Sequence, residues 1–264
     1  MPNPTGVENL TSSDFEIKKP KILFFDIETA PNLGYVWGKY EQNVIEFTSE
    51  WYMLAWSAKW KDGKHITKCL ADYEGYDPLS ENDRLLVTDL HKLLAEADIV
   101  IAHNGNKFDV KRSNTRFIEH GLLPPEPYKV VDTLQVARKH FGFTSNKLDD
   151  LGHRLGVGRK VKTGGFDLWK GCMSGDPKAW RKMKAYNRMD VLLLERVYDK
   201  LLPWISGHPS IASLEGNEGA CPACGDTHIQ NRGWTPTPTG VFRRRQCMRC
   251  GHWFRGKHKR TQSQ

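Results

Sequence analysis

The chain has 264 residues, of which 39% are hydrophobic and 27% charged, a composition typical of a globular protein and unlike a disordered or fibrous one. No apolar run has the length of a membrane span, and residues 1–19 lack the apolar core of a signal peptide. We therefore expect a protein that makes no membrane contact and stays in the cytoplasm. In that reducing compartment the six cysteines indicate metal ligands or free thiols rather than disulfides.

The net charge of +8 comes from the last part of the chain. From Cys221 onward there are nine Lys and Arg against one acid, Asp226, which leaves 30 basic and 30 acidic residues before it. A concentrated basic segment predicts a polyanionic partner, and nucleic acid is the obvious one. The alternative is a solvated basic tail that serves solubility.

The first predicted elements are strands that follow a polar lead-in over residues 1–20. A continuous apolar run over 22–27 predicts a strand buried on both faces. Residues 51–60 and 65–70 flank Asp62-Gly63, and this arrangement predicts a β-hairpin. We therefore expect three antiparallel strands at the start of the fold.

Helices and strands alternate after the hairpin. Helical apolar spacing over 80–97 predicts a helix capped by Ser80, and residues 98–102 predict another buried strand. A helix over about 107–120 and a short strand at 129–131 come next. This order favours an α/β fold with a mixed sheet.

The remainder up to Trp204 is predicted to be mainly helical. Asp176-Pro177 predicts the start of the last long helix, because an acidic cap and a proline at the first helical position favour helix initiation. This helix is expected to run to about Leu202 and to stop before Pro203. A stretch rich in Gly, Ser and Pro over 206–219 is then predicted to be a linker.

Three short acidic motifs are the most informative local feature. They are Phe25-Asp26-Ile27-Glu28-Thr29, Asn104-Gly105-Asn106-Lys107-Phe108-Asp109 and Tyr186-Asn187-Arg188-Met189-Asp190. Residues two apart on a strand face the same side, and residues four apart on a helix share a face. Neighbouring carboxylates repel each other unless a cation lies between them, and hard cations such as Mg²⁺ prefer oxygen ligands.

The order and residue types of these motifs resemble those of the DEDD superfamily of 3′→5′ exonucleases. The last motif, Tyr-x-x-x-Asp, resembles that of the DEDDy subclass. The resemblance covers about residues 20–205 and implies a ribonuclease H-like fold, a mixed five-stranded sheet flanked by helices. It implies a two-metal-ion hydrolase that uses Mg²⁺ or Mn²⁺. The site residues that it implies are Asp26 bridging both ions, Glu28 and Asp190 on the nucleophile-side ion, Asp109 on the second ion, and Tyr186 orienting the attacking water.

Other residues near these motifs are candidates for contact with nucleic acid. Thr29 is expected near the terminal nucleotide, with an ordinary strand-end hydroxyl as the alternative, and Asn104 is expected to contact substrate. The glycine-rich loop 158–165 contains three cations that predict a grip on the phosphate backbone, and an exposed connector is the alternative. These cations are Arg159, Lys160 and Lys162.

Two C-x-x-C pairs predict a separate metal-binding module over residues 220–256, followed by a basic tail over 257–264. The pairs are Cys221-Pro222-Ala223-Cys224 and Cys247-Met248-Arg249-Cys250, each followed by glycine. They predict a zinc ribbon in which four cysteines hold one structural Zn²⁺, and unligated thiols or a redox pair are the alternative. The module resembles zinc-ribbon tails on phage-encoded and bacterial relatives.

The predicted ribbon places cations among aromatic side chains. Such a surface could pair with phosphates and stack on unpaired bases, although the aromatic rings could equally form the small core of the ribbon. The candidates for contact with nucleic acid are Arg243, Arg244, Arg245 and Trp253. A ribbon that serves as a protein–protein adaptor is a further alternative.

The sequence as a whole predicts a metal-dependent 3′→5′ exonuclease that acts on single-stranded 3′ ends, with DNA favoured over RNA. Its setting would be the cytoplasm of a bacterial host if the protein is phage-encoded. Proofreading would need a separate polymerase or replication protein as a partner. The alternatives are an RNA-processing exoribonuclease, a ribonuclease H-class endonuclease, and a nucleic-acid-binding zinc-ribbon protein with a non-catalytic nuclease fold.

Overall fold

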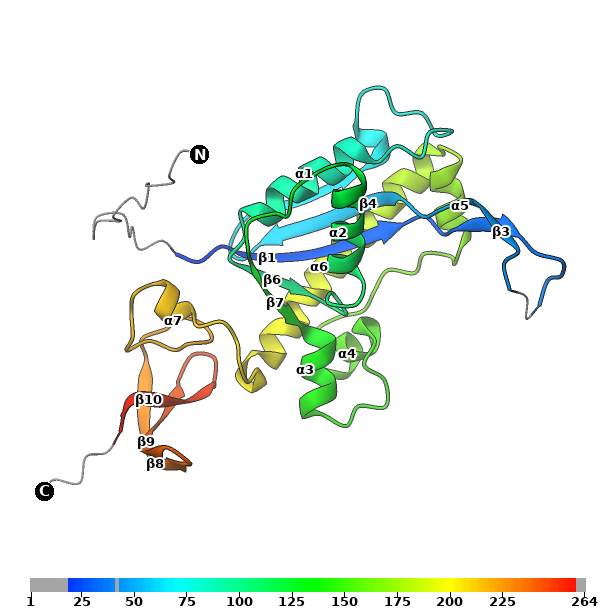
Figure 1. Ribbon diagram of the computed structural model, residues 1–264. Helices are drawn as coiled ribbons and strands as arrows, with labels where there is room; N and C mark the ends of the chain where they lie inside the picture. The colour runs from blue at the N-terminus through cyan, green and yellow to red at the C-terminus, as the bar shows by residue number, and fades with distance from the viewer. Residues whose placement is uncertain (1–18, 41–42, 260–264) are drawn as a thin grey trace, which may run out of the picture. The chain divides into compact units, whose positions relative to one another are not determined.

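The computed structural model of the protein describes residues 19–40 and 43–259, with side chains described up to residue 256. The chain divides into two compact units, one spanning Lys21–His208 and the other containing the C-terminal part from Pro209 onward. Figure 1 shows the helices and strands of both units. Over the described residues, no helix combines the length and the apolar character needed to cross a bilayer.

The larger unit is built on a five-stranded mixed sheet in the order β5-β4-β1-β6-β7. β1 (Ile22–Thr29) pairs antiparallel with β4 (Met53–Trp60) and parallel with β6 (Ile99–Ala102). β5 (His65–Cys69) is antiparallel to β4, and β7 (Lys129–Asp132) is parallel to β6. The predicted mixed five-stranded sheet is confirmed, with β1 at its centre.

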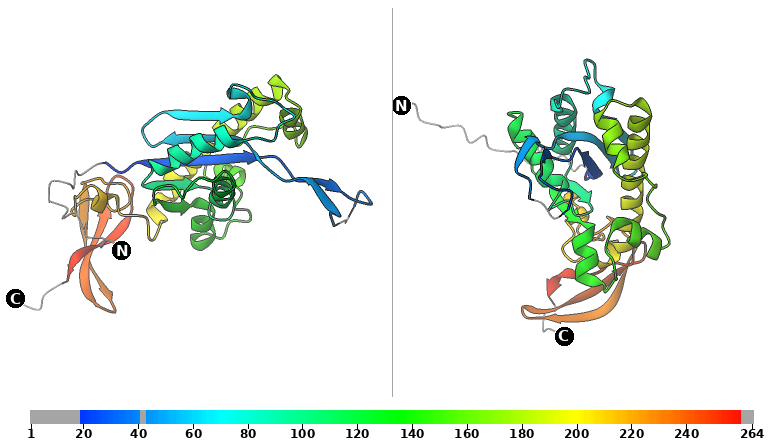
Figure 2. Two further views of the ribbon diagram at one scale, coloured as in Figure 1. Left: turned by 45° about the horizontal axis from the view of Figure 1, so that its top comes forward. Right: turned by 90° about the vertical axis from the view of Figure 1, so that its right-hand side faces the viewer.

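Helices cover both faces of this sheet. Figure 2 shows α6 on one face and α1 and α2 on the other. The helices are α1 (Arg84–Ala95), α2 (Asp109–Glu119), α3 (Thr133–His140), α4 (Leu148–Arg154), α5 (Asp167–Met173) and α6 (Pro177–Leu201), with short 3-10 turns η2 (Leu70–Asp72) and η3 (Leu202–Trp204).

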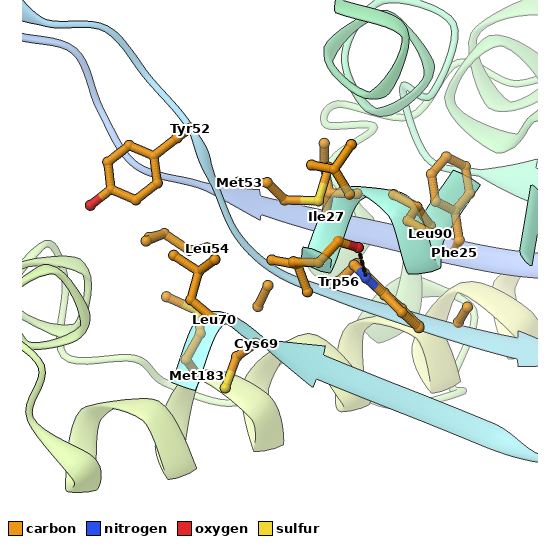
Figure 3. Close-up of a cluster of buried hydrophobic side chains, with 14 of the residues drawn as sticks. Phe25, Ile27, Tyr52, Met53, Leu54, Trp56, Cys69, Leu70, Leu90 and Met183 are labelled. Carbon is orange, nitrogen blue, oxygen red and sulfur yellow. Dashed lines mark hydrogen bonds between the residues drawn. The ribbon is translucent and has the colours of Figure 1, made fainter. Parts of the chain in front are cut away.

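β1 is buried on both faces because its side chains alternate between two packed layers. Phe25 and Ile27 belong to the apolar cluster that contains Leu90 of α1 (Figure 3). Phe24 points the other way, and its ring lies edge-on to that of Tyr198 on α6, with 5.3 Å between the ring centroids. This double burial explains why the strand reads as a continuous apolar run.

The predicted hairpin is confirmed, since β4 and β5 are joined by a turn in which Asp62 has φ of 61°. In the same region the structure buries Trp56, whose indole nitrogen donates a hydrogen bond to the carbonyl oxygen of Leu86 on α1 at 3.0 Å (Figure 3). That bond satisfies the one polar group of the ring and fixes α1 against the sheet.

The predicted start of α1 was wrong. The helix begins at Arg84, after Asp83, so Ser80 does not cap it. Asp83 does not cap it with its side chain either, because its buried carboxylate accepts hydrogen bonds from the backbone of Met53 at 2.7 Å and from Arg116 of α2 at 2.8 Å. The carboxylate oxygens of Asp83 therefore bind residues from other elements instead of the first backbone N–H groups of the helix.

The start of α6 agrees with its sequence signal. The Asp176 carboxylate accepts a hydrogen bond from the backbone of Lys178 at 2.8 Å, and Pro177 occupies the first helical position. The helix is 25 residues long and ends at Leu201, one residue before the predicted end. The third acidic motif therefore lies within one continuous helix, α6.

A second small sheet was not predicted. β2 (Leu33–Tyr35) and β3 (Glu46–Ser49) form a two-stranded antiparallel ribbon that connects β1 to β4 and that we call the arm. Figure 1 shows the arm extending beyond the end of β1. Many of its large apolar side chains are exposed, Trp37 to 89%. These side chains pack against no core, so the apolar residues of the arm do not alternate with polar ones. The sequence therefore contained no indication of these two strands.

The C-terminal unit contains a three-stranded antiparallel sheet in the order β10-β9-β8. Its strands are β8 (Ile229–Thr237), β9 (Gly240–Cys247) and β10 (Trp253–Lys259). A helical turn, α7 (Ile211–Leu214), lies within the segment predicted to be a linker, and the backbone nitrogen of Ile211 donates to the carbonyl oxygen of Pro222 at 2.8 Å. Part of that segment is therefore ordered against the cysteine-bearing module.

Candidate active site

The first and third acidic motifs meet at one place in the Lys21–His208 unit. Asp26 and Glu28 lie on β1, and Asp190 lies on α6. One carboxylate oxygen from each of these residues lies within 4.8 Å of the others. The site is formed because α6 crosses the sheet face toward which Asp26 and Glu28 point.

The second motif contributes Asp109, at the start of α2. Its carboxylate is buried and accepts a hydrogen bond from the backbone nitrogen of Ile27 at 3.1 Å, between the two acids of β1. Asp109 lies outside the three-residue group above. Its charge nevertheless acts on that group, since it raises the pKa of Asp26.

Burial and mutual repulsion raise the pKa of these carboxyl groups. Burial has the largest effect on the pKa of Asp26, followed by the charges of Asp109, Glu28 and Asp190. Burial also raises the pKa of Glu28 to about 8 and that of Asp109 to about 7. The four carboxyl groups cannot easily all be ionised at once. Added positive charge would therefore stabilise the ionised site.

Lys160 supplies part of that charge. Its Nζ lies 2.6 Å from Oδ2 of Asp190 and 3.2 Å from the hydroxyl of Tyr186, and its backbone nitrogen donates to Asp149 at 2.6 Å. Its charge lowers the pKa of Glu28. The structure therefore separates Lys160 from the other two cations of the loop, because Arg159 and Lys162 are exposed.

Tyr186 lies one helical turn before Asp190 on α6. Burial, then the charge of Asp190, raises the pKa of its hydroxyl above the ordinary value. The phenol therefore stays protonated at neutral pH, so its hydroxyl can donate a hydrogen bond while it accepts one from the Lys160 ammonium. Its ring lies edge-on to Trp169 of α5, with 6.2 Å between the ring centroids.

Three further residues support the site although sequence reasoning missed their roles. Asn187 is fully buried, and its Nδ2 donates to Oδ2 of Asp26 at 2.6 Å. The indole of Trp169 lies near Glu28 and lowers the pKa of that carboxyl. The position of Asn187 inside the third motif was an available signal, whereas that of Trp169 in a separate helix was not.

Asp132 is the third missed residue. Its buried carboxylate accepts from the backbone nitrogens of Asn104 at 2.9 Å, Asn106 at 3.3 Å and Leu134 at 3.0 Å. It thereby caps α3 and holds the loop of the second motif, in which Asn104 has φ of 68°. An acid at a strand end directly before a helix was the available signal.

Thr29 ends β1 and lines a cavity of about 500 Å³ beside the carboxylates. Trp51, Arg112, Phe166 and Trp169 also line it. The cavity thus includes a residue that the sequence predicted to contact the terminal nucleotide. Asn104 is not among its lining residues.

The four cysteines of the C-terminal unit also meet. Their sulfur atoms all lie within 4.8 Å of one another, with 3.7 Å between Cys221 and Cys250 and 3.7 Å between Cys224 and Cys247. Four sulfurs around a tetrahedral Zn²⁺ at about 2.3 Å would lie about 3.8 Å apart, whereas a disulfide would need about 2 Å. The donor set therefore fits zinc.

The predicted arginine run lies on β9 next to aromatic rings. The guanidinium of Arg243 lies 4.1 Å from the ring centroid of Trp234, and that of Arg244 lies 5.4 Å from that of Trp253. Consecutive residues of a strand point to opposite faces, so the two pairs lie on opposite faces of the sheet. Arg245, on the face of Arg243, has its Nε buried without a hydrogen-bond partner among the described residues.

Comparison with known proteins identifies a family and similar solved structures. A family model described as the RNase_H superfamily matches residues 23–202. The family B DNA polymerase from the hyperthermophilic archaeon Pyrobaculum calidifontis is similar with a TM-score of 0.49 and 17% identity. The similarity covers 85% of this chain but only 32% of the polymerase chain, about a third of its length. No curated protein matched the sequence.

Proposed function

The chain belongs to the RNase H superfamily, and we propose that its larger unit is a metal-dependent 3′→5′ exonuclease of the DEDDy type. The observation that carries this proposal is the convergence of Asp26 and Glu28 from β1 with Asp190 from α6. Tyr186 lies beside that group, and Asp109 acts on it from the start of α2.

The carboxylates suit two Mg²⁺ or Mn²⁺ ions. Oδ1 of Asp190 is buried and has no hydrogen-bond partner among the described residues, which leaves an oxygen ligand free for a cation. Asp26, Glu28, Asp109 and Asp190 would hold the ions. Divalent ions in such sites make water more acidic and offset negative charge at the phosphate.

The protein residues hold and orient the reacting groups. Asn187 keeps the carboxylate of Asp26 in one orientation through the 2.6 Å hydrogen bond to its Oδ2. The protonated hydroxyl of Tyr186 can orient the attacking water by hydrogen bonding, and Trp169 lowers the pKa of Glu28 and so favours its ionised form. Lys160 places an ammonium where the negative charge of a scissile phosphate would approach Asp190 and Tyr186.

The proposed substrate is nucleic acid with an unpaired 3′ end, and single-stranded DNA is favoured over RNA. The C-terminal unit would bind one Zn²⁺ through Cys221, Cys224, Cys247 and Cys250 and add nucleic-acid affinity through Arg243, Arg244, Arg245 and Trp253. Arg159 and Lys162 would contact the phosphate backbone from the exposed loop. Proofreading would take place with a separate polymerase, in the cytoplasm.

The test is digestion of end-labelled single-stranded DNA and RNA in Mg²⁺ or Mn²⁺ by the wild-type protein and by Asp190→Asn. We expect release of mononucleotides from the first turnover, from DNA faster than from RNA, and loss of cleavage in the variant with binding in Ca²⁺ retained. Asp167→Asn is the matched control, because that carboxylate lies on α5 with its side chain 88% exposed.

Each other outcome would assign a different function. Internal fragments before mononucleotides would indicate an endonuclease, and faster release from RNA would indicate an exoribonuclease. Nucleic-acid binding without cleavage in the wild type, unchanged in Asp190→Asn, would indicate a binding protein with a non-catalytic nuclease fold.

A further inference from the structure

The N-terminal half of α6 carries charge of one sign only. Residues 177–189 contain five cations and no acid, whereas residues 190–201 contain three acids and two cations. Four of the five cations are exposed, and one is half-buried. This half of the helix therefore presents concentrated positive charge at the surface. The five cations are Lys178, Arg181, Lys182, Lys184 and Arg188.

This arrangement of cations does not favour the helix itself. Lys178 and Lys182 are four residues apart, and like charges at that spacing repel each other on a helix. The Asp176 carboxylate is used to cap the helix, through the backbone nitrogen of Lys178 at 2.8 Å. Of the five cations only Lys184 forms an ion pair with another described residue, Asp72, at 2.7 Å. A row of uncompensated cations that opposes helix stability indicates a surface that binds an anion.

Two of these cations lie on the same ridge of α6 as the third acidic motif. Residues four apart form a ridge along a helix, and four residues rise by about 6 Å. Lys182 lies four residues before Tyr186, and Lys178 lies four residues earlier still. A stretched nucleotide unit spans a length similar to that rise. The spacing of the two lysines therefore suits successive phosphates of a strand whose end lies at Asp190.

The glycine-rich loop 158–165 runs along the same ridge. Near one end of this loop, the ammonium of Lys160 lies 3.2 Å from the hydroxyl of Tyr186. Near the other end, a Cβ added to Gly164 would lie 3.6 Å from Nζ of Lys182. Lys162 comes between these two points in the sequence, and it is exposed without an ion pair to any described residue. The loop therefore adds a third cation beside the ridge.

We propose that Lys178 and Lys182, with Lys162 beside them, bind the phosphates that lie on the 5′ side of the scissile phosphate. A strand whose 3′ end lies at the carboxylates continues only in the 5′ direction. Its next phosphates would relieve the repulsion between the lysines of the ridge and release counterions. This inference rests on the proposed function for its biological meaning, but binding alone can test its physical content.

The first test moves one methylphosphonate linkage, which carries no charge, along a short oligothymidylate. Affinity is measured in Ca²⁺ by fluorescence anisotropy. Neutralising the second or the third linkage from the 3′ end should weaken binding by the wild type about two- to fivefold, as expected for an exposed ion pair. Lys178→Gln/Lys182→Gln, which we call the ridge variant, should lose most of this sensitivity. A wild type indifferent to both linkages, or a ridge variant as sensitive as the wild type, would overturn the proposal.

Two matched variants separate the position of the charges from their number. Lys92→Gln/Lys200→Gln removes two exposed lysines, from α1 and from the far end of α6, and should behave as the wild type. Lys178→Arg/Lys182→Arg keeps both charges and should keep the sensitivity. The ridge variant should be no less stable than the wild type, because it removes a like-charge pair from the helix. A Lys92/Lys200 variant as impaired as the ridge variant would contradict the proposal.

The salt dependence of binding gives an independent count of the phosphates bound. For single strands, the slope of log K against log[salt] changes by about 0.7 for each phosphate that a protein neutralises. The slope for the ridge variant should therefore be shallower by about 1.4 than that for the wild type, and the Lys92/Lys200 variant should keep the wild-type slope. Equal slopes for the wild type and the ridge variant would count against any phosphate contact at these lysines.

Cleavage of the unmodified oligothymidylate in Mn²⁺ separates this inference from the proposed function. The ridge variant should have a raised KM and little change in kcat, because neither lysine contacts the reacting atoms. A wild type that is sensitive to the second and third linkages but releases no nucleotide would keep the phosphate-binding ridge and lose the exonuclease assignment. A wild type that releases nucleotides but binds every singly neutralised strand equally well would keep the exonuclease and lose the ridge.

Discussion

Asp109→Asn should stabilise the metal-free protein at pH 8 while it removes activity. Burial raises the pKa of Asp109 from 3.8 to about 7. Between these two values the unfolded chain has released the proton and the folded state has kept it, so the free energy of unfolding falls as the pH rises. A shift of about three units corresponds to about 4 kcal/mol.

Asparagine avoids this loss because it carries no proton to release. Its side-chain oxygen can still accept the hydrogen bond that the Ile27 backbone makes to Asp109. The variant should therefore be more stable than the wild type by up to about 4 kcal/mol above pH 7, with the difference vanishing toward pH 4. Removing this charge also relieves Asp26, whose pKa Asp109 raises.

The assay is urea unfolding followed by the helical circular dichroism signal, in buffer freed of Mg²⁺ and Mn²⁺. This signal reports mainly on the larger unit, which contains α1 to α6, and the C-terminal unit is the same in both proteins. Added Mn²⁺ should stabilise the wild type more than the variant. A variant no more stable than the wild type at pH 8, or a difference that does not shrink on acidification, would refute the reasoning.

Three further predictions concern the supports of the site, the cysteine cluster and a packed glycine. Asn187→Ala should lower kcat by about tenfold or more with little change in KM, because Asp26 loses the hydrogen bond that orients it. Cys247→Ser should lower the zinc content below one ion per chain in a colorimetric release assay, since a tetrahedral site needs all four sulfurs. Gly152→Ala should lower the free energy of unfolding by about 1–3 kcal/mol, because an added Cβ would lie 2.7 Å from Leu193 of α6.

Each of these predictions has a matched control. Arg188→Ala changes the exposed neighbour of Asn187 and should leave kcat within about twofold, a change too small for a lost catalytic support. Cys172→Ser changes a buried thiol outside the cluster and should leave the zinc content unchanged. Gly142→Ala adds a Cβ in open space and should change stability by less than about 0.5 kcal/mol. A control variant as impaired as its partner would contradict the corresponding argument.

The sheet was predictable from local sequence because a buried strand shows a recognisable pattern of apolar residues. The double burial of β1 produced its apolar run, and the Asp62-Gly63 turn indicated the β4–β5 hairpin. The capped start of α6 was equally local. The arm has no such pattern. Its apolar side chains are exposed, so they are not required to alternate with polar ones along the strands.

Two supports of the candidate site, Lys160 and Trp169, could not be predicted in the same way. Lys160 reaches Asp190 across 30 positions of sequence, and Trp169 reaches Glu28 from a different helix. These contacts depend on how the loop after α4 and helix α5 pack against α6, which no local pattern encodes. The acids of the motifs could be identified because each motif is a short stretch of sequence. That the three motifs meet in the folded protein is not visible in any one of them.

The place of β1 in the sheet ties any chemistry at Asp26 and Glu28 to the integrity of the whole unit. β6 pairs with the first part of this strand, Ile22–Phe24, and β4 pairs with it in regular register as far as Glu28, where the chain departs into the arm. The pairing with β4 fixes the spacing of the two acids, so this spacing should persist as long as the sheet does. The exposed arm lies beyond this point, so changes in the length of the arm would leave the pairing that holds the two acids undisturbed.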